Sequence, residues 1–137
     1  MKILLKENRK GTVFVEEVPE PSLQPGGIIV RNHYSAISLG TEMQNIDIAR
    51  KSLLQKARSR PDDLKKVFNL AKKEGYYSAY TKAIARLETP APLGYSSSGE
   101  VVSIGGGIDN FSLGDYVACG GIGFANHSEF SYIPKNL

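Results

Sequence analysis

Residues 92–102, PLGYSSSGEVV, separate two regions of the chain that have different sequence patterns. Pro90 and Pro92 end a helical pattern, because proline interrupts a helix and favours an extended backbone in the residue before it. Residues 99–104 then predict a strand, and the three glycines at 105–107 predict a turn. Further short strands are predicted at 116–119 and 128–133. The carboxyl-terminal part is therefore expected to be β structure.

Residues 1–38 also show strand signals. Positions that alternate, or nearly so, with polar neighbours are Val13, Val15, Ile28, Val30, Asn32 and Tyr34. The breaks between them come from Pro19, Pro21, Pro25, Gly26 and Gly27. The opening part of the chain is therefore predicted to be a run of strands that pair with their neighbours.

Between residues 41 and 87 the hydrophobic period changes from two to about 3.6, which is typical of helices. The clearest helix is predicted over 61–75, with proline and aspartates in its first turn, lysines near its end and Gly75 to stop it. Its apolar stripe is Leu64, Val67, Phe68 and Ala71. A second helix is predicted to begin near Ser78 as cap, with Tyr80, Ala83, Ile84 and Leu87 on one face. A third is predicted through Ile46, Ala49, Leu53 and Leu54.

Length and composition fit one domain. The chain has 137 residues, 41% of them hydrophobic, which is enough to bury a core. The predicted fold class is mainly β with a helical insertion at about 43–88. No apolar run is long enough to span a bilayer, and the start of the chain does not read as a signal peptide, so a cytoplasmic location without membrane insertion is expected.

The net charge of +3 is unevenly distributed. Residues 47–88 carry a balance of +6 and the rest of the chain carries −3. Such a segment could attract an anionic ligand or an acidic partner, or it could be the solvated face of helices. Cys119 is the only cysteine, which excludes an internal disulfide and a multi-cysteine zinc cluster within one chain.

Three stretches together resemble one family. They are residues 35–42 (SAISLGTE), residues 92–102, and the run from 102 to 137 with its Gly114-Asp115-Tyr116-Val117 and His127-Ser128-Glu129-Phe130 segments. In this order they are similar to the amino-terminal domain of medium-chain dehydrogenases/reductases. The resemblance implies a GroES-like β-barrel over 1–137. It also implies that a Rossmann domain, which binds NAD or NADP, would follow outside this chain.

The helical insert carries a closer resemblance. The insert is similar to that of a subgroup of the family that is fused to a Gfo/Idh/MocA-type oxidoreductase module. The similar residues are 52–54, 56–58, 60–62 and 74–75, which lead into residues 92–97. That subgroup is linked with bacterial polysaccharide biosynthesis. The resemblance implies a small-molecule substrate of sugar or nucleotide-sugar type.

The chain departs from the family at its zinc ligands. Leu39 stands where zinc enzymes of the family have a cysteine, and Tyr95 and Ser96 stand where they have a histidine and a carboxylate. Leucine offers no lone pair, and hydroxyls are poor replacements for thiolate and imidazole in a tetrahedral zinc site. We therefore expect no catalytic zinc.

Without a metal, polarisation of a carbonyl group would fall to hydroxyl groups. Thr41 matches the family's relay hydroxyl, and Tyr95 lies where a ligand would face the substrate, so the resemblance suggests both as catalytic residues. Leu39, Glu42 and Ser96 are expected to line the substrate site, with Glu42 bonding backbone amides. The alternative for Tyr95 is a buried aromatic residue whose hydroxyl is satisfied by its neighbours.

Other candidate residues have simpler interpretations. Residues 105–107 and 120–123 are glycine-rich but do not lead into a helix, so they predict turns rather than a phosphate-binding loop. His33 and His127 are interpreted as structural or exposed. Asp115 is expected to form a turn and Cys119 to lie in the core.

Two functions remain open at this point. The first is the substrate-binding half of a zinc-independent, NAD(P)-dependent oxidoreductase, which would be inactive alone because hydride transfer needs the cofactor. The second is a non-catalytic module that docks a protein partner through its basic helices. Nucleic-acid binding is not expected, because the basic segment carries no recognition motif.

Overall fold

The computed structural model describes residues 1–50, 69, 72 and 75–137. Contacts between Cα atoms divide the chain into two units. The first comprises Met1–Leu5, Phe14–Glu42 and Pro92–Leu137, and the second comprises Lys6–Val13 and Met43–Ala91. The first unit holds most of the β structure and is described first.

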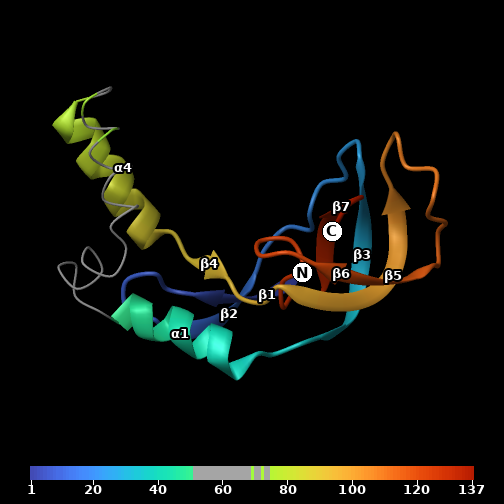
Figure 1. The fold of residues 1–137 in the computed structure, drawn as a ribbon, viewed down its shortest axis with the longest axis horizontal. Helices are drawn as coiled ribbons and strands as arrows, with labels where there is room; N and C mark the ends of the chain where they lie inside the picture. Colours follow the sequence, from blue (N-terminus) through green and yellow to red (C-terminus); the bar gives the residue numbers. More distant parts are fainter. Residues whose placement is uncertain (51–68, 70–71, 73–74) are drawn as a thin grey trace. The chain divides into compact units, whose positions relative to one another are not determined.

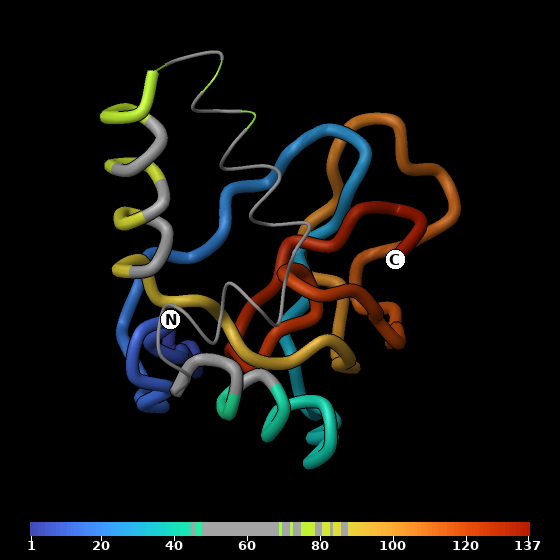
Figure 2. Tube along the Cα trace, turned by 60° about the vertical axis from the view of Figure 1, so that its left-hand side comes forward, coloured from blue at the N-terminus to red at the C-terminus, as the bar shows by residue number. Residues whose placement is uncertain are grey.

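A four-stranded antiparallel sheet forms the centre of the first unit (Figure 1). Its order is β6-β5-β3-β7, built from β3 (Gly27–Ser35), β5 (Ser96–Ile104), β6 (Tyr116–Gly120) and β7 (Phe130–Pro134). Figure 2 shows that the early strand β3 runs among the carboxyl-terminal strands, in agreement with its pairing with β5 and β7. The strands predicted at 99–104, 116–119 and 128–133 are confirmed, with small shifts of their ends.

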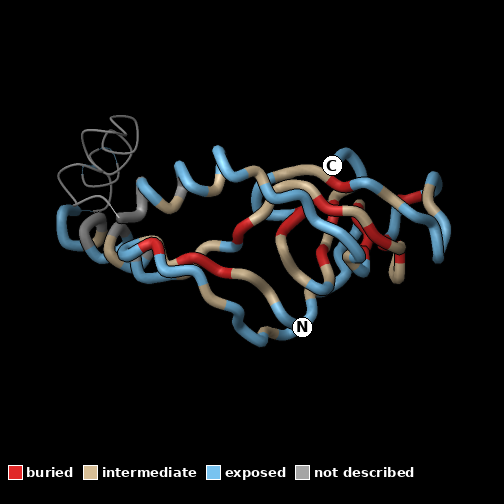
Figure 3. The backbone as a smooth tube through the Cα atoms, turned by 90° about the horizontal axis from the view of Figure 1, so that it is seen from below, coloured by how far each residue is buried: buried red, intermediate tan, exposed pale blue. Residues whose placement is uncertain are grey.

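The core lies along this sheet, where Figure 3 shows buried positions on neighbouring strands. Its buried members are Ile28, Val30, Val101, Ile108, Cys119, Ala125 and Ile133. Val30 is fully buried, and Cys119 is 4% exposed, so the prediction that Cys119 lies in the core is confirmed. Burying a valine or isoleucine side chain stabilises the fold by roughly 1.5–3 kcal/mol each.

The burial of β3 does not follow the predicted alternation, since residues 27–30 are all buried and residues 33–35 are all exposed. Tyr34 is 78% exposed, although Ile28 and Val30 at the same parity are buried. The register of β3 against β5 shifts between Ile29 and Val30 and again between Asn32 and Tyr34. Each such irregularity changes the face on which the following residues lie, because side chains alternate with period two.

Gly99 pairs with Asn32, next to the second register shift between β3 and β5. A Cβ atom built at Gly99 would overlap the carbonyl oxygen of Arg31 on the neighbouring strand. Only glycine allows the two backbones to come this close. Gly99 therefore permits the local packing of β3 against β5.

A second sheet has the order β2-β1-β4, from β1 (Lys2–Lys6), β2 (Val13–Glu17) and β4 (Ala91–Pro92). Within the first unit, β1 is joined to the segment before β7 by backbone bonds. The Leu4 amide donates to the His127 carbonyl at 2.8 Å, and the Glu129 amide donates to the Lys2 carbonyl at 3.1 Å. The predicted fold class, mainly β with a helical insertion, is confirmed.

The described helices are α1 (Leu39–Arg50) and α4 (Tyr76–Glu88). α1 begins four residues before the predicted insertion boundary at about 43. The prediction of Ser78 as a helix cap was wrong, since the N-cap of α4 is Gly75 with φ 91° and without a side-chain hydrogen bond. Glycine adopts such a φ without steric cost, so the chain turns into the helix one turn earlier than predicted.

Some predictions fall outside the described residues. These include Leu53, Leu54 and the helix over 61–75 apart from residues 69, 72 and 75. In the part of the chain that the structure describes, no helix is long and apolar enough to cross a membrane.

Candidate functional site

The site lies in the first unit, where β3 ends and α1 begins. The ladder of β3 with β5 continues to the pair Ser35 and Ser97, and the Ala36 amide donates to the Ser96 carbonyl at 3.0 Å. Four residues after Ser35, at Leu39, the chain enters α1. This short connection fixes the end of the strand and the start of the helix close to each other.

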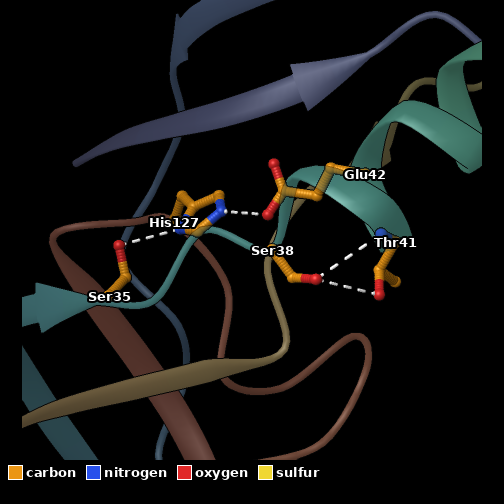
Figure 4. Close-up of polar contacts among 5 residues, drawn as sticks. All are labelled: Ser35, Ser38, Thr41, Glu42 and His127. Carbon is orange, nitrogen blue, oxygen red and sulfur yellow. Dashed lines mark hydrogen bonds and ion pairs between the residues drawn. The ribbon is translucent and has the colours of Figure 1, made fainter.

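Ser38 caps α1 and holds Thr41 (Figure 4). The Ser38 carbonyl accepts the Glu42 amide at 2.9 Å, and Ser38 Oγ accepts the Thr41 amide at 3.5 Å. The Ser38 hydroxyl also donates to Thr41 Oγ1 at 3.2 Å. A serine in this position satisfies an amide that the helix leaves unpaired. Glu42 consequently lies in the first turn, where the helix dipole favours a negative charge.

The backbone of His127 is held by two other segments. Its amide donates to the Leu93 carbonyl at 2.9 Å, and its carbonyl accepts the Leu4 amide. Gly94 has φ 96°, and a Cβ atom there would lie 2.7 Å from the His127 nitrogen. Gly94 therefore provides both the turn and the close approach that place the imidazole beside α1.

The His127 side chain links β3 to α1 (Figure 4). Its Nδ1 lies 2.8 Å from Ser35 Oγ, and its Nε2 lies 2.9 Å from Glu42 Oε1. The side chains of His127 and Glu42 are only 9% and 13% exposed, whereas Ser35 is an exposed residue. A hydroxyl, an imidazole and a carboxylate thus form one hydrogen-bonded chain that begins at the surface and ends at a nearly buried acid.

The residues predicted for the site are brought together in part. Leu39, Thr41 and Glu42 share the first turn of α1, with Leu39 74% exposed. Among the residues that the structure describes, the Glu42 carboxylate bonds the His127 imidazole and not the backbone amides that the sequence suggested.

Tyr95 and Ser96 are both partly buried and lie at the start of β5. The Tyr95 carbonyl accepts the Gly121 amide at 2.9 Å. Ser96 is adjacent to Ala36 through its backbone carbonyl. Among the described residues, no hydrogen bond joins the Tyr95 hydroxyl to Thr41, so the structure does not couple the two hydroxyls directly.

Ser35 was not singled out from the sequence, and His127 was interpreted as structural or exposed. The structure places both in the hydrogen-bonded chain with Glu42. His127 and Glu42 are 85 positions apart, and Ser35 and His127 are 92 apart. No local spacing connects residues at such separations, so only the folded sheet shows the relationship.

A shallow cavity of about 280 Å³ opens on the four-stranded sheet, and Ser35, His127 and Glu42 are not among the residues that line it. It is lined by His33, Tyr34, Ser98, Gly99, Tyr116, Val117 and Ala118. Tyr34 and Tyr116 are 78% and 76% exposed, and the His33 and Tyr116 rings meet edge to face at 5.6 Å between centroids. Aromatic walls with a few hydroxyl and imidazole groups are typical of small-molecule sites.

The glycine-rich segments are turns, as predicted. Residues 105–107 leave β5 and residues 121–123 leave β6, and neither segment enters a helix. Asp115 forms a turn as predicted, since its Oδ2 accepts the Ser112 amide at 2.7 Å. Within residues 1–50, 69, 72 and 75–137, no three His, Cys, Asp or Glu side chains form a group that could hold a metal ion.

Comparisons with solved structures show the same fold in longer proteins. An alcohol dehydrogenase superfamily protein from Novosphingobium aromaticivorans matches 100% of this chain with 33% of its own, at a TM-score of 0.63 and 20% identity. The quinone oxidoreductase from Coxiella burnetii covers 99% of this chain with 35% of its own chain, at a TM-score of 0.55 and 19% sequence identity. The 2R,3R-butanediol dehydrogenase from Bacillus subtilis covers 99% of this chain with 39% of its own chain, at a TM-score of 0.58 and 16% sequence identity. No protein-family model matches the sequence, and no curated protein matches it significantly.

These similarities define the class of fold. The similar structures belong to the medium-chain alcohol dehydrogenase/reductase superfamily, and their shared portion is the mainly β, GroES-like domain. The fold implied by the sequence resemblance is therefore confirmed. The chain spans about a third of the length of the structures it matches.

Proposed function

We propose that this chain is the substrate-binding domain of a zinc-independent, NAD(P)-dependent oxidoreductase. The observation that carries the proposal is the shared fold with the first part of dehydrogenases and reductases, together with Leu39 at the position of a thiolate ligand. A fold alone does not establish a reaction, so the proposal depends on the residues at the start of α1 and β5.

The donor set at these positions does not fit a catalytic zinc ion. Leu39 has no donor atom, and its neighbours in the proposed site, Tyr95 and Ser96, offer neutral hydroxyls. Zinc in proteins takes thiolate, imidazole and carboxylate ligands. Proton transfer and polarisation of the substrate oxygen therefore fall to the hydroxyl and imidazole groups of this domain.

The described residues also do not fit the phosphates of a dinucleotide. Such phosphates are usually held where a glycine-rich turn enters a helix, and neither glycine-rich segment does so here. We propose that further polypeptide, a Rossmann domain, holds NAD or NADP. When bound, the nicotinamide would supply or accept the hydride.

In this proposal Thr41 and Tyr95 act on the substrate oxygen. The Thr41 hydroxyl is already oriented by Ser38 at 3.2 Å, which lowers the cost of ordering it during the reaction. The Tyr95 hydroxyl would donate a proton or a hydrogen bond to an oxyanion. Leu39, Glu42 and Ser96 would shape the site around the substrate.

We propose a sugar or nucleotide-sugar substrate, as in bacterial polysaccharide biosynthesis. The support is the resemblance of the helical insert, together with the cavity on the four-stranded sheet, whose aromatic walls and Ser98 hydroxyl suit a ligand with apolar and polar faces. A cytoplasmic location is part of the proposal, because the single cysteine is free and buried, as is usual in a reducing compartment.

The test compares the full-length enzyme with the 137-residue chain. NADH or NADPH is expected to raise the Tm of the full-length enzyme and to leave that of the chain unchanged. If neither responds, the oxidoreductase proposal fails and a docking module is favoured. In the responding enzyme, Tyr95→Phe and Thr41→Val are expected to lower kcat by about 100-fold each, since a positioned acid contributes 10²–10⁴-fold. Unchanged kcat in Tyr95→Phe would remove that residue from the mechanism.

A further inference from the structure

We propose that the shallow cavity on the four-stranded sheet binds an uncharged sugar ring, with Tyr34, Tyr116 and His33 as the side chains that contact it. The inference rests on the proposed function for the sugar class of the substrate, and it names where the ring of that substrate is held. The residues that line the cavity belong to β3, β5 and β6, three neighbouring strands of one sheet. The site therefore lies wholly within the first unit.

The cavity opens on the outer face of the sheet, opposite the core. Along β5, residues 97, 99 and 101 are buried and residues 96, 98 and 100 are only partly buried. Because side chains alternate along a strand, Ser98 points away from the core. Tyr34 and Ala118 are the ladder partners of Ser98 on the two flanking strands, and directly opposite residues share a face of the sheet. The floor at Ser98 and Ala118 and the wall at Tyr34 therefore lie on the solvent side.

An irregularity in β3 brings two consecutive ring-bearing residues to the cavity. The register against β5 shifts between Asn32 and Tyr34, so the residue between them, His33, has no partner in this ladder. In a regular strand His33 and Tyr34 would face opposite sides, but here both line the cavity. An extra residue in a strand re-aims the side chains beside it. The His33 ring meets the Tyr116 ring edge to face, at 86° between the ring planes, so the irregularity adds an imidazole to the aromatic wall.

Both tyrosines of the cavity are unusually exposed. Tyrosine commonly has intermediate burial in a folded protein, but Tyr34 and Tyr116 are 78% and 76% exposed. They stand on β3 and β6, on either side of β5, and the small side chains of Ser98 and Ala118 lie between them. Exposed aromatic rings gain free energy when a ligand removes them from water. Two such rings around one hollow therefore favour a ligand whose faces are apolar.

The charges around the cavity favour an uncharged ligand. Among the described residues that line it, none is Lys, Arg, Asp or Glu. The next charged residues on this face of the ladder are Arg31 and Glu100, which pair with each other at 3.9 Å. The Arg31 guanidinium also lies over the Phe130 ring, 5.8 Å from its centroid. A phosphate group would therefore not find in this lining the arginine or lysine that usually binds it.

A sugar ring matches the chemistry and the size of the cavity. A pyranose carries C–H groups on its faces and hydroxyl groups around its edge. The faces pack on the tyrosine rings, while the Ser98 hydroxyl, the tyrosine hydroxyls and the ring nitrogens of His33 supply donors and acceptors for the edge. The volume of about 280 Å³ is just below the roughly 300–1,000 Å³ of sites for drug-sized ligands, so the cavity takes one ring rather than a whole nucleotide.

The cavity lies on the same face of the sheet as Ser96, one of the residues proposed to bind the substrate. Ser96 and Ser98 are two residues apart on β5, and both belong to the partly buried outer set. At the rise of a β-strand this separation is about 7 Å. The Ser96 carbonyl accepts the Ala36 amide, which belongs to the segment that leads into α1. A substrate that carries a second group beyond its ring would therefore extend from the cavity towards Ser96.

The first experiment titrates the 137-residue chain with simple sugars and follows its backbone amides by 15N NMR. The probes are the methyl glycosides of glucose, galactose, mannose and N-acetylglucosamine, and the controls are inorganic phosphate and glycerol. At least one glycoside is expected to shift the amides of residues 33–34, 98–99 and 116–118, whereas phosphate and glycerol leave them unchanged. Shifts with phosphate and with no glycoside would make the cavity an anion site and overturn the inference.

The second experiment repeats the titration with variants of the cavity. Tyr34→Ala and Tyr116→Ala are each expected to raise the Kd of the best glycoside by about 10-fold, because each removes a ring face, and Tyr116→Phe is expected to keep most of the affinity. Ala118→Leu keeps both tyrosines but fills the floor, so it is expected to abolish the shifts. Tyr77→Ala, at an 86% exposed tyrosine of α4, is the matched control. The Tm of each tyrosine variant checks that it folds.

The outcomes separate the sugar site from the oxidoreductase proposal. If a nicotinamide nucleotide raises the Tm of the full-length enzyme but no glycoside shifts the cavity amides, the sugar site is wrong and the oxidoreductase proposal stands. If a glycoside binds but Tyr34→Ala and Tyr116→Ala change its Kd no more than Tyr77→Ala does, the ring is held elsewhere and the inference is equally wrong. If glycosides bind at the cavity and no nicotinamide nucleotide binds the full-length enzyme, the sugar site stands and the oxidoreductase proposal fails.

Discussion

Glu42 and His127 lie 85 positions apart in the sequence, yet Oε1 of the acid and Nε2 of the imidazole meet at 2.9 Å. Both side chains are nearly buried, at 13% and 9% exposed. One belongs to the first turn of α1 and the other to the segment before β7. The contact therefore ties the beginning of the helix to the carboxyl-terminal strands.

Replacing Glu42 by alanine is expected to destabilise the protein by about 1–3 kcal/mol, because the Nε2–H group loses its acceptor at a poorly hydrated position. Glu42→Gln keeps an acceptor oxygen and is expected to cost less. The measurement is the free energy of unfolding from urea titration. Glu16→Ala, at an exposed position of β2, is the control and is expected to change it by less than about 0.5 kcal/mol. Equal values for Glu42→Ala and Glu16→Ala would show that the contact adds nothing to stability.

Gly94→Ala is expected to be strongly destabilising for two reasons. The residue has φ 96°, which alanine adopts only with strain, and its Cβ would lie 2.7 Å from the His127 nitrogen. Backbone strain of this kind costs about 1–3 kcal/mol, and the steric overlap adds to it. Gly106→Ala is the matched control, since a Cβ atom at that glycine would have nothing within 4 Å and its φ is not positive. A smaller loss of Tm for Gly94→Ala than for Gly106→Ala would contradict the assignment.

Much of the fold could be predicted from sequence, because hydrophobic spacing and turn residues act locally. Residues 99–104 and 116–119 have apolar residues and flanking turns that leave few alternatives to strands. The face of Tyr34 could not be predicted in this way. It depends on register shifts between β3 and β5, which arise when two strands pair and leave no mark in either strand alone.

The candidate site was predictable only where one short segment holds it. Leu39, Thr41 and Glu42 lie within four consecutive residues, so any helix that begins at this point places all three in its first turn. The partner of Glu42 depends on where residues 93 and 94 hold the backbone of His127. Local sequence therefore suggested backbone partners for Glu42 and no partner for His127.

Cys119 is expected to react slowly with alkylating reagents in the folded protein. Burial raises the pKa of the Cys119 thiol, because desolvation disfavours the thiolate, so less thiolate is present at a given pH. The rate of modification by iodoacetamide at pH 8 should rise with pH and increase sharply in urea. The control is a variant with Cys119→Ala and Ala118→Cys, which moves the thiol to an exposed neighbour on β6. Equal rates for the two folded proteins would contradict burial of the native thiol.

Ser38→Ala is expected to loosen the first turn of α1, because the Thr41 amide loses the acceptor that Ser38 Oγ provides. Loss of such a cap costs about 1 kcal/mol, and Ser38→Asp, which keeps a side-chain acceptor, should retain most of it. Hydrogen exchange of the Thr41 amide is the direct measurement, and it should accelerate in Ser38→Ala but not in Ser38→Asp. The same substitution removes the partner of Thr41 Oγ1. If exchange at Thr41 is unchanged, the 3.5 Å contact is too weak to be a cap, and the orientation of the Thr41 hydroxyl must come from the helix itself.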